Sequence, residues 1–164
     1  MSSIPMVVLV GTSGTGKTTF LEKLIKELRS RKIIVGTIKH DVHGFEMDQP
    51  GKDTWRHARA GSDAVAISSP TKVALVRSVE QEMELDKVAE LLGPVAIILV
   101  EGYKRSAKPK IEIHRKAHAA GLLSAPEELI ALVSDTEWDF GVPTFDLEDA
   151  KGVADLLVAK FGLS

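Results

Sequence analysis

A stretch near the N-terminus has the residue types and the spacing of a phosphate-binding loop. It fits the pattern G-x-x-x-x-G-K-[ST] with a further threonine behind it, and its residues are Gly11, Thr12, Ser13, Gly14, Thr15, Gly16, Lys17, Thr18 and Thr19. In such a loop the backbone amides surround a phosphate, the lysine reaches the terminal phosphates, and the hydroxyl after the lysine can bind Mg²⁺. Four fixed positions would match by chance in well under about 1% of chains of this length. We therefore predict that this phosphate loop (residues 11–19) binds a nucleoside triphosphate.

The flanking residues predict the two elements that hold the phosphate loop. The apolar run Met6–Val10 before it is typical of a buried parallel strand. Behind it, apolar residues recur at helical spacing, which predicts a helix from Lys17 to about Arg31. This order of strand, loop and helix lets the helix N-terminus add its partial positive charge to the anion site.

A carboxylate directly follows another strongly apolar stretch. The run Val95–Val100 predicts a buried strand, and Glu101 comes after it. Because ligands of a parallel sheet bind beyond the carboxyl ends of its strands, we expect Glu101 to face the phosphate loop, where it would hold the Mg²⁺ shell or position water. Glutamate is one methylene longer than the aspartate usual there, so direct ligation and contact through water both stay open. We assign Thr18 and Glu101 to the metal, and Lys17 and Glu101 to the catalytic set.

A second candidate catalytic carboxylate is Asp41, at the end of a predicted strand over residues 33–39. It could reach the γ-phosphate side of the site as part of the Mg²⁺ shell, as a water-orienting group or as a general base. The nearby His40 and His43 do not indicate zinc, because no third and fourth ligand follows at a suitable spacing.

Two further sets of residues bear on what else could bind. The segment after Glu101 is basic and could hold a second anion; its cations are Lys104, Arg105, Lys108 and Lys110, with Arg115 and Lys116 beyond. Asp135 follows the predicted strand over residues 129–134, and its carboxylate could accept hydrogen bonds from guanine N1 and N2. The chain has no asparagine, so the common N-K-x-D guanine motif is missing, and spacing alone does not separate guanine from adenine.

Strand-like and helical patterns alternate along the chain, which predicts an α/β fold with a mostly parallel sheet between two helical layers. The remaining strands are expected at 110–114 and 129–134, with helices from about Pro50 to Gly61, at 85–92 and from residue 146 or 147 onward. Residues 64–68 and 72–79 flank Ser69-Pro70-Thr71 and predict an antiparallel hairpin inserted on the sheet. We predict a three-layer P-loop NTPase fold in one nucleotide-binding domain over residues 1–164.

Composition narrows the class of protein. The chain has 164 residues, a formal net charge of −2 and no cysteine. Such a charge gives no overall attraction to nucleic acid or to an anionic membrane, and the missing thiols exclude disulfides and thiolate metal sites. No apolar run approaches a membrane span, and the residues before the first strand leave no room for a signal peptide. We therefore expect a cytoplasmic protein that binds neither nucleic acid nor membrane.

Several segments, in order along the chain, resemble those of one known family, the molybdopterin-guanine dinucleotide biosynthesis protein B family. The resemblance spans about residues 6–160. Besides the phosphate loop, it depends on Thr37-Ile38-Lys39-His40, on residues 48–54 (Asp-Gln-Pro-Gly-Lys-Asp-Thr), on Arg59-Ala60-Gly61, on Val100-Glu101-Gly102-Tyr103-Lys104 and on Pro109-Lys110-Ile111-Glu112.

This resemblance implies a GTP-binding adaptor with Mg²⁺ and weak GTPase activity. It also implies a homodimer that works with the molybdenum cofactor guanylyltransferase, which joins GMP to molybdopterin. Carried over by position, Glu101 and Asp41 would lie near the γ-phosphate and Asp135 near the base. The basic segment could then hold the anionic molybdopterin, and the hairpin edge could pair across the dimer.

Two other readings stay open. A small-molecule kinase on the same scaffold would use Asp41 as base toward an acceptor hydroxyl, but no arginine-rich lid segment is evident late in the chain. A GTPase that delivers a metal would be expected to show histidine tracts or paired cysteines, and the chain has neither. We expect nucleotide binding first and slow hydrolysis second, because no catalytic glutamine or intrinsic arginine finger is evident.

Overall fold

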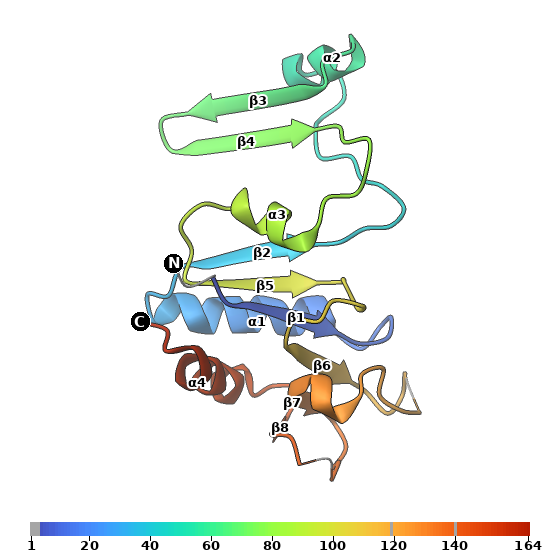
Figure 1. Ribbon diagram of the computed structural model, residues 1–164, viewed down its shortest axis with the longest axis vertical. Coiled ribbons are helices and arrows are strands. Elements are labelled where there is room, and N and C mark those ends of the chain that lie inside the picture. The colour runs from blue at the N-terminus through green and yellow to red at the C-terminus, as the bar shows by residue number, and fades with distance from the viewer. Residues whose placement is uncertain (1–3, 119, 140) are drawn as a thin grey trace. The chain divides into compact units, whose positions relative to one another are not determined.

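Six parallel strands form the central sheet, and the strand with the phosphate loop at its end lies inside it (Figure 1). The structure is a computed structural model that describes residues 4–118, 120–139 and 141–164. The spatial order is β2-β5-β1-β6-β7-β8, and every described pairing in this sheet is parallel. The strands are β1 Met6–Val10, β2 Val35–Lys39, β5 Ile97–Glu101, β6 Lys110–His114, β7 Leu129–Ser134 and β8 Thr144–Phe145.

Helices cover both faces of this sheet, which confirms the predicted three layers. Helices α1 (Lys17–Ser30) and α4 (Ala150–Phe161) lie together on one face, and α3 (Leu85–Glu90) lies on the other (Figure 1). Side chains of β1 alternate between these layers, since Val7 and Leu9 pack with α1 and α4 while Val8 and Val10 pack with α3. All residues of β1 are buried, so the phosphate loop begins from a fixed strand.

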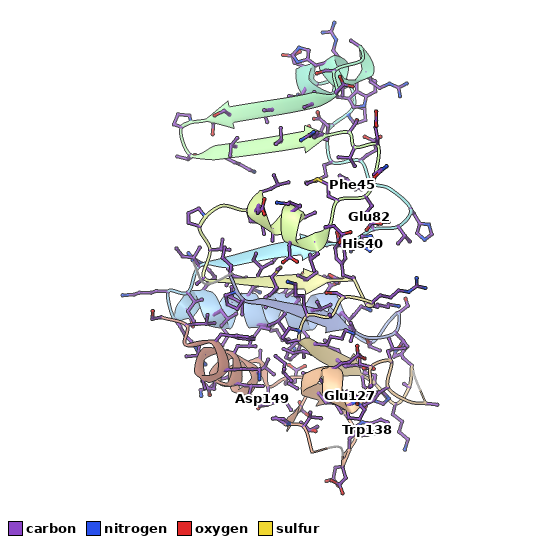
Figure 2. All side chains as sticks on the ribbon, viewed as in Figure 1. His40, Phe45, Glu82, Glu127, Trp138 and Asp149 are labelled. Atoms are coloured by element: carbon purple, nitrogen blue, oxygen red, sulfur yellow. The ribbon has the colours of Figure 1, made fainter. Side chains whose placement is uncertain are left out.

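The last helix begins later than the sequence pattern predicted. The expected start was residue 146 or 147, but α4 begins at Ala150 with Asp149 as its cap (Figure 2). The Asp149 carboxylate accepts a hydrogen bond from the Gly152 amide at 2.8 Å, so it satisfies a first-turn donor that has no partner within the helix. The Asp146 carboxylate accepts from the Glu148 amide instead, at 2.8 Å, which makes a turn before the helix.

Residues 41–84 form a compact unit of their own, inserted between β2 and α3. This inserted unit contains α2 (Asp53–Arg59) and a hairpin of β3 (Ala64–Ser69) and β4 (Lys72–Arg77), which confirms the antiparallel hairpin. The strands of the hairpin pair with each other in a two-stranded sheet of their own. That residues 1–164 act as one nucleotide-binding domain stays a prediction.

The other predicted elements are present with ends shifted by a few residues. Two short ones were not predicted: β8 and a 3-10 turn at Pro126–Glu128. Among the described residues, no helix has the length and apolar character that a membrane crossing needs. The signal-peptide prediction concerned Met1–Pro5, of which residues 1–3 lie outside the described residues.

Candidate functional site

The phosphate loop connects the end of β1 to the start of α1 and needs its glycines for backbone conformation. Gly14 and Gly16 have φ values of 82° and 92°, in the left-handed region that residues with a Cβ avoid. Gly11 has little room: a Cβ there would overlap the carbonyl oxygen of Ile113 in β6 and lie 2.9 Å from Thr15 Oγ1. At Gly11 the loop therefore passes too close to β6 for a larger residue.

Lys17 turns back into the phosphate loop. Its ammonium donates to the carbonyl oxygens of Gly11 at 3.0 Å and Thr12 at 2.9 Å. Burial lowers the pKa of Lys17, the charges of Lys104 and Lys39 lower it further, and Glu101 opposes them. Cations crowd around this ammonium, so an anion bound in the loop would gain from several positive charges at once.

Thr18 and Glu101 supply the oxygen atoms on which the metal prediction depends. Glu101 ends β5, the strand beside β1, and its carboxylate accepts from the Thr18 hydroxyl at 3.2 Å. Lys39 ends the next strand, and its ammonium lies 4.0 Å from Glu101 Oε1. The Glu101 side chain is 14% exposed, so it faces a sheltered space beside the loop. The structure thus brings together Lys17, Thr18 and Glu101, which the sequence placed in one site.

Asp41 is the first residue of the inserted unit, and its exposed carboxylate accepts a hydrogen bond from the His43 amide at 2.9 Å. This contact makes a local turn of the kind that aspartate often forms. The assignment of Asp41 to the catalytic set stays a prediction.

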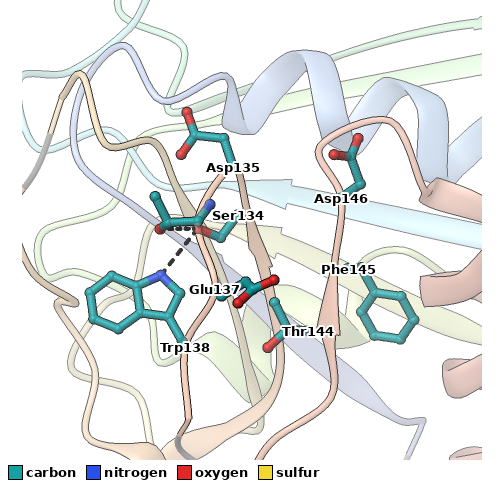
Figure 3. A pocket seen from close by; sticks show the side chains of 8 residues that line it. Ser134, Asp135, Glu137, Trp138, Thr144, Phe145 and Asp146 are labelled. Atoms are coloured by element: carbon teal, nitrogen blue, oxygen red, sulfur yellow. Dashed lines mark hydrogen bonds between the residues drawn. The ribbon is translucent and has the colours of Figure 1, made fainter.

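Asp135 follows β7 and lines an open hollow of about 530 Å³ at the carboxyl end of the sheet (Figure 3). The hollow is lined by Ser134, Asp135, Thr136, Glu137, Trp138, Thr144, Phe145 and Asp146. Asp135 Oδ1 accepts a hydrogen bond from the Lys116 amide at 2.9 Å. The indole of Trp138 donates to Ser134 Oγ at 3.1 Å and fixes one wall of the hollow.

The basic segment is smaller than the sequence indicated. Lys110 is only 3% exposed, because it lies within β6 and forms an ion pair with Glu128. Lys108 is held by Asp86 at 2.7 Å. Of the four cations predicted there, Lys104 and Arg105 are the two without a salt bridge among the described residues.

One cation reaches the phosphate loop from a part of the chain far away in sequence. Arg115 follows β6, and its Nε donates to the carbonyl oxygen of Thr15 at 3.1 Å. His118, three residues on, lies against the loop as well, since a Cβ on Gly14 would come within 3.0 Å of its ring. The sequence showed Arg115 only as one of several basic residues, and no spacing signal linked it to the loop.

These residues fit a nucleotide with Mg²⁺. The loop has glycines at positions where a Cβ would come close to neighbouring groups, and the Lys17 ammonium lies inside the loop. Among the described residues no group of three or more His, Cys, Asp or Glu side chains is arranged to hold a metal ion. Mg²⁺ commonly takes only one or two protein oxygens and completes its shell with water and phosphate. The hydroxyl of Thr18 and the carboxylate of Glu101 match that donor set.

Comparison with known sequences points to a single family. Residues 6–135 match the protein-family model described as Molybdopterin guanine dinucleotide synthesis protein B. The molybdopterin-guanine dinucleotide biosynthesis adapter protein of Haemophilus influenzae is 34% identical over 158 residues, which cover 95% of this chain and 89% of that protein. The adapter protein of the same description from Escherichia coli is 35% identical over 161 residues, covering 94% and 92%.

Solved structures agree with the sequences. The crystal structure of Bacillus subtilis MobB superposes with a TM-score of 0.74 at 26% identity and covers 96% of this chain and 98% of that one. A crystal structure of molybdopterin-guanine biosynthesis protein B gives a TM-score of 0.71 at 26% identity, with 94% and 99% covered. The chain therefore belongs to the molybdopterin guanine dinucleotide synthesis protein B family, with the P-loop nucleotide-binding fold of that family.

Proposed function

We propose that this chain is a GTP-binding adapter of molybdopterin guanine dinucleotide biosynthesis with weak GTPase activity. The observation that carries the proposal is the contact between Thr18 of the phosphate loop and Glu101 of the neighbouring strand. It occurs in a chain whose relatives are described as adapter proteins of that pathway. The comparisons give no support to the kinase alternative.

The loop residues divide the binding between them. The amides of residues 14–19 and the Lys17 ammonium would neutralise the β- and γ-phosphates. Thr18 and Glu101 would hold Mg²⁺, which when bound spreads the charge of the terminal phosphates. Asp41, at the start of the inserted unit, would respond to the presence of the γ-phosphate.

Slow hydrolysis is expected because no catalytic glutamine and no intrinsic arginine finger is evident in the sequence. We therefore expect the bound GTP to act mainly as a signal that the protein is loaded with nucleotide, and not as a substrate for rapid hydrolysis. A turnover of many per second without a partner would contradict the adapter role.

We place the guanine base at the hollow beyond Asp135. Three carboxylates line it, from Asp135, Glu137 and Asp146, and carboxylates accept hydrogen bonds from the N1 and N2 donors that guanine has and adenine lacks. A thermal-shift series with GTP and ATP, each with Mg²⁺, tests this selection because a ligand stabilises the fold according to its affinity. GTP should raise the melting temperature more than ATP, and Asp135→Ala should remove the difference. Equal shifts with both nucleotides in the unchanged protein would contradict the base site.

The second copy of a homodimer would bind at the hairpin. Among the described residues, the two strands of the hairpin pair only with each other, and most of their apolar side chains are exposed. Four of them are Ile67, Val73, Leu75 and Val76, which are 41–71% exposed. Sheet edges and apolar patches of this kind commonly pair with another chain. Sedimentation velocity at micromolar concentration should show a dimer, and a monomer there would count against the proposal.

The pathway partners would act beside the nucleotide. Lys104 and Lys39 lie close enough to Lys17 to lower its pKa, so they extend the positive charge beyond the phosphate loop toward an anionic molybdopterin. We propose that the guanylyltransferase receives both ligands from this edge, in the cytoplasm. Co-sedimentation of the chain with the guanylyltransferase should strengthen with GTP and Mg²⁺. Lys104→Ala should weaken the binding of molybdopterin. Lys108→Ala should not, because Lys108 is paired with Asp86.

A further inference from the structure

We propose that Arg115 is a positioning residue of the phosphate loop: it holds the Thr15–Gly16 peptide so that the Gly16 amide faces the bound phosphates. The inference rests on the proposed function, because it needs a phosphate ligand in the loop. It adds a residue that lies 100 positions from Thr15 along the chain.

The Arg115 guanidinium lies against the middle of the loop. Its Nε donates to the Thr15 carbonyl oxygen at 3.1 Å. A Cβ on Gly16 would be 3.7 Å from Nη2 and 3.8 Å from Nε, so the guanidinium lies on the side of Gly16 where a side chain would be. Hydrogen bonds from a charged donor are stronger than those between neutral groups. Arg115 thus holds the Thr15–Gly16 peptide unit through a hydrogen bond to its carbonyl oxygen.

Because a peptide unit is planar, a hydrogen bond that fixes the Thr15 carbonyl also fixes the direction of the Gly16 N–H. No peptide bond among the described residues is cis, so the carbonyl of Thr15 and the N–H of Gly16 point in opposite directions. With the carbonyl directed to Arg115, the Gly16 N–H is directed away from Arg115. In a phosphate loop the amides face the anion, so this is the orientation that binding requires.

This peptide needs an outside contact to keep its orientation. Gly16 has a φ of 92°, and glycine reaches both positive and negative φ at little cost, so the unit can turn over easily. A reversed unit would present the carbonyl oxygen of Thr15 to the phosphates and repel them. An arginine bonded to that oxygen makes the reversal costly.

The segment that carries Arg115 is itself held in place by four hydrogen bonds. The carboxylate of Asp135 accepts from the Lys116 amide at 2.9 Å, and the His118 amide donates to the Arg115 carbonyl at 2.9 Å. Further on, the buried carboxylate of Glu112 accepts from the amides of Leu123 and Ser124. The segment that carries Arg115 is thus anchored to β6 and β7. Asp135 therefore has a structural effect on the loop that is separate from any contact with the base.

The test separates positioning from simple charge. Arg115→Met removes the donor and the charge but keeps an unbranched side chain, whereas Arg115→Lys keeps the charge and one terminal donor. Lys116→Met is the matched control, because it removes an exposed charge one residue away and leaves the backbone amide that Asp135 binds. Affinity for GTP with Mg²⁺ is measured by calorimetry, and the Gly16 amide proton is followed by NMR in the free and the bound protein.

For the unchanged protein we expect a large downfield shift of the Gly16 amide proton on binding, as for an N–H that donates to a phosphate. Arg115→Met should weaken GTP binding about tenfold and abolish that shift, while the Thr18 and Thr19 amides still respond. Arg115→Lys should fall in between on both readouts, and Lys116→Met should stay within about twofold of the unchanged protein. If Arg115→Met does not fold, Arg115→Lys still gives the comparison.

Unchanged affinity in Arg115→Met would overturn the inference. So would an equal loss in Arg115→Met and Lys116→Met with the Gly16 shift retained, because charge alone would then explain the effect. If the unchanged protein showed no response to GTP, the proposed function would fail instead, which is a different result from either of these.

Discussion

Replacing Gly11 with alanine should destabilise the protein strongly, because two costs add at this position. Gly11 has a φ of 155°, which residues with a side chain rarely adopt, and such strain costs about 1–3 kcal/mol. The new Cβ would overlap the Ile113 carbonyl oxygen. That oxygen cannot move away easily, because β6 is paired on both sides, with β1 and with β7. Overpacking of this kind costs a further amount of about 1–3 kcal/mol.

The sum is about 2–6 kcal/mol, a large part of the typical stability of a domain of about 5–15 kcal/mol. Gly162→Ala is the matched control, since Gly162 has a φ of 62° and open space around it, so only the conformational cost of about 1–2 kcal/mol applies. Urea unfolding followed by circular dichroism gives both free energies if the slopes agree. A Gly11→Ala protein as stable as Gly162→Ala would refute the steric argument.

Three further predictions follow from single contacts. Glu112→Gln should lower the free energy of unfolding by about 1–3 kcal/mol in urea, because one of the two backbone amides that the buried Glu112 carboxylate binds loses its acceptor, whereas exposed Glu127→Gln should change little. Burial lowers the pKa of Lys17 in the free protein and bound phosphate would raise it, so GTP binding should take up protons at alkaline pH. The calorimetric enthalpy should then vary with the ionisation enthalpy of the buffer, and a constant enthalpy would contradict the account. Asp135→Asn should keep the affinity for GTP better than Asp135→Ala, because asparagine can still accept from the Lys116 amide; equal losses would contradict that role.

The parts of this fold that local patterns determine could be predicted from the sequence. Strand β1, the phosphate loop and α1 follow one another without a gap, and each has a periodicity or a glycine spacing of its own. The pairing of Thr18 with Glu101 also followed, because parallel strands place their carboxyl ends at the same edge of a sheet.

Other features depend on contacts between distant residues. Lys110, Glu112 and His114 alternate with isoleucines along β6, a pattern typical of a strand with one exposed face, but all three are buried. They are buried because partners satisfy them: Glu128 for Lys110, two backbone amides for Glu112 and Ser134 for His114. No spacing in the sequence indicates those partners. The contact between Arg115 and Thr15 could not be predicted for the same reason.

The proposed function requires that the phosphate loop binds GTP. Calorimetric titration of the purified chain with GTP and Mg²⁺, beside the Lys17→Met variant, is the direct test, because Lys17 is the cation that lies inside the loop. We expect saturable binding by the unchanged chain, little competition from ATP, and a loss of about tenfold or more in Lys17→Met. Equal GTP affinity in the two proteins would contradict the proposed function.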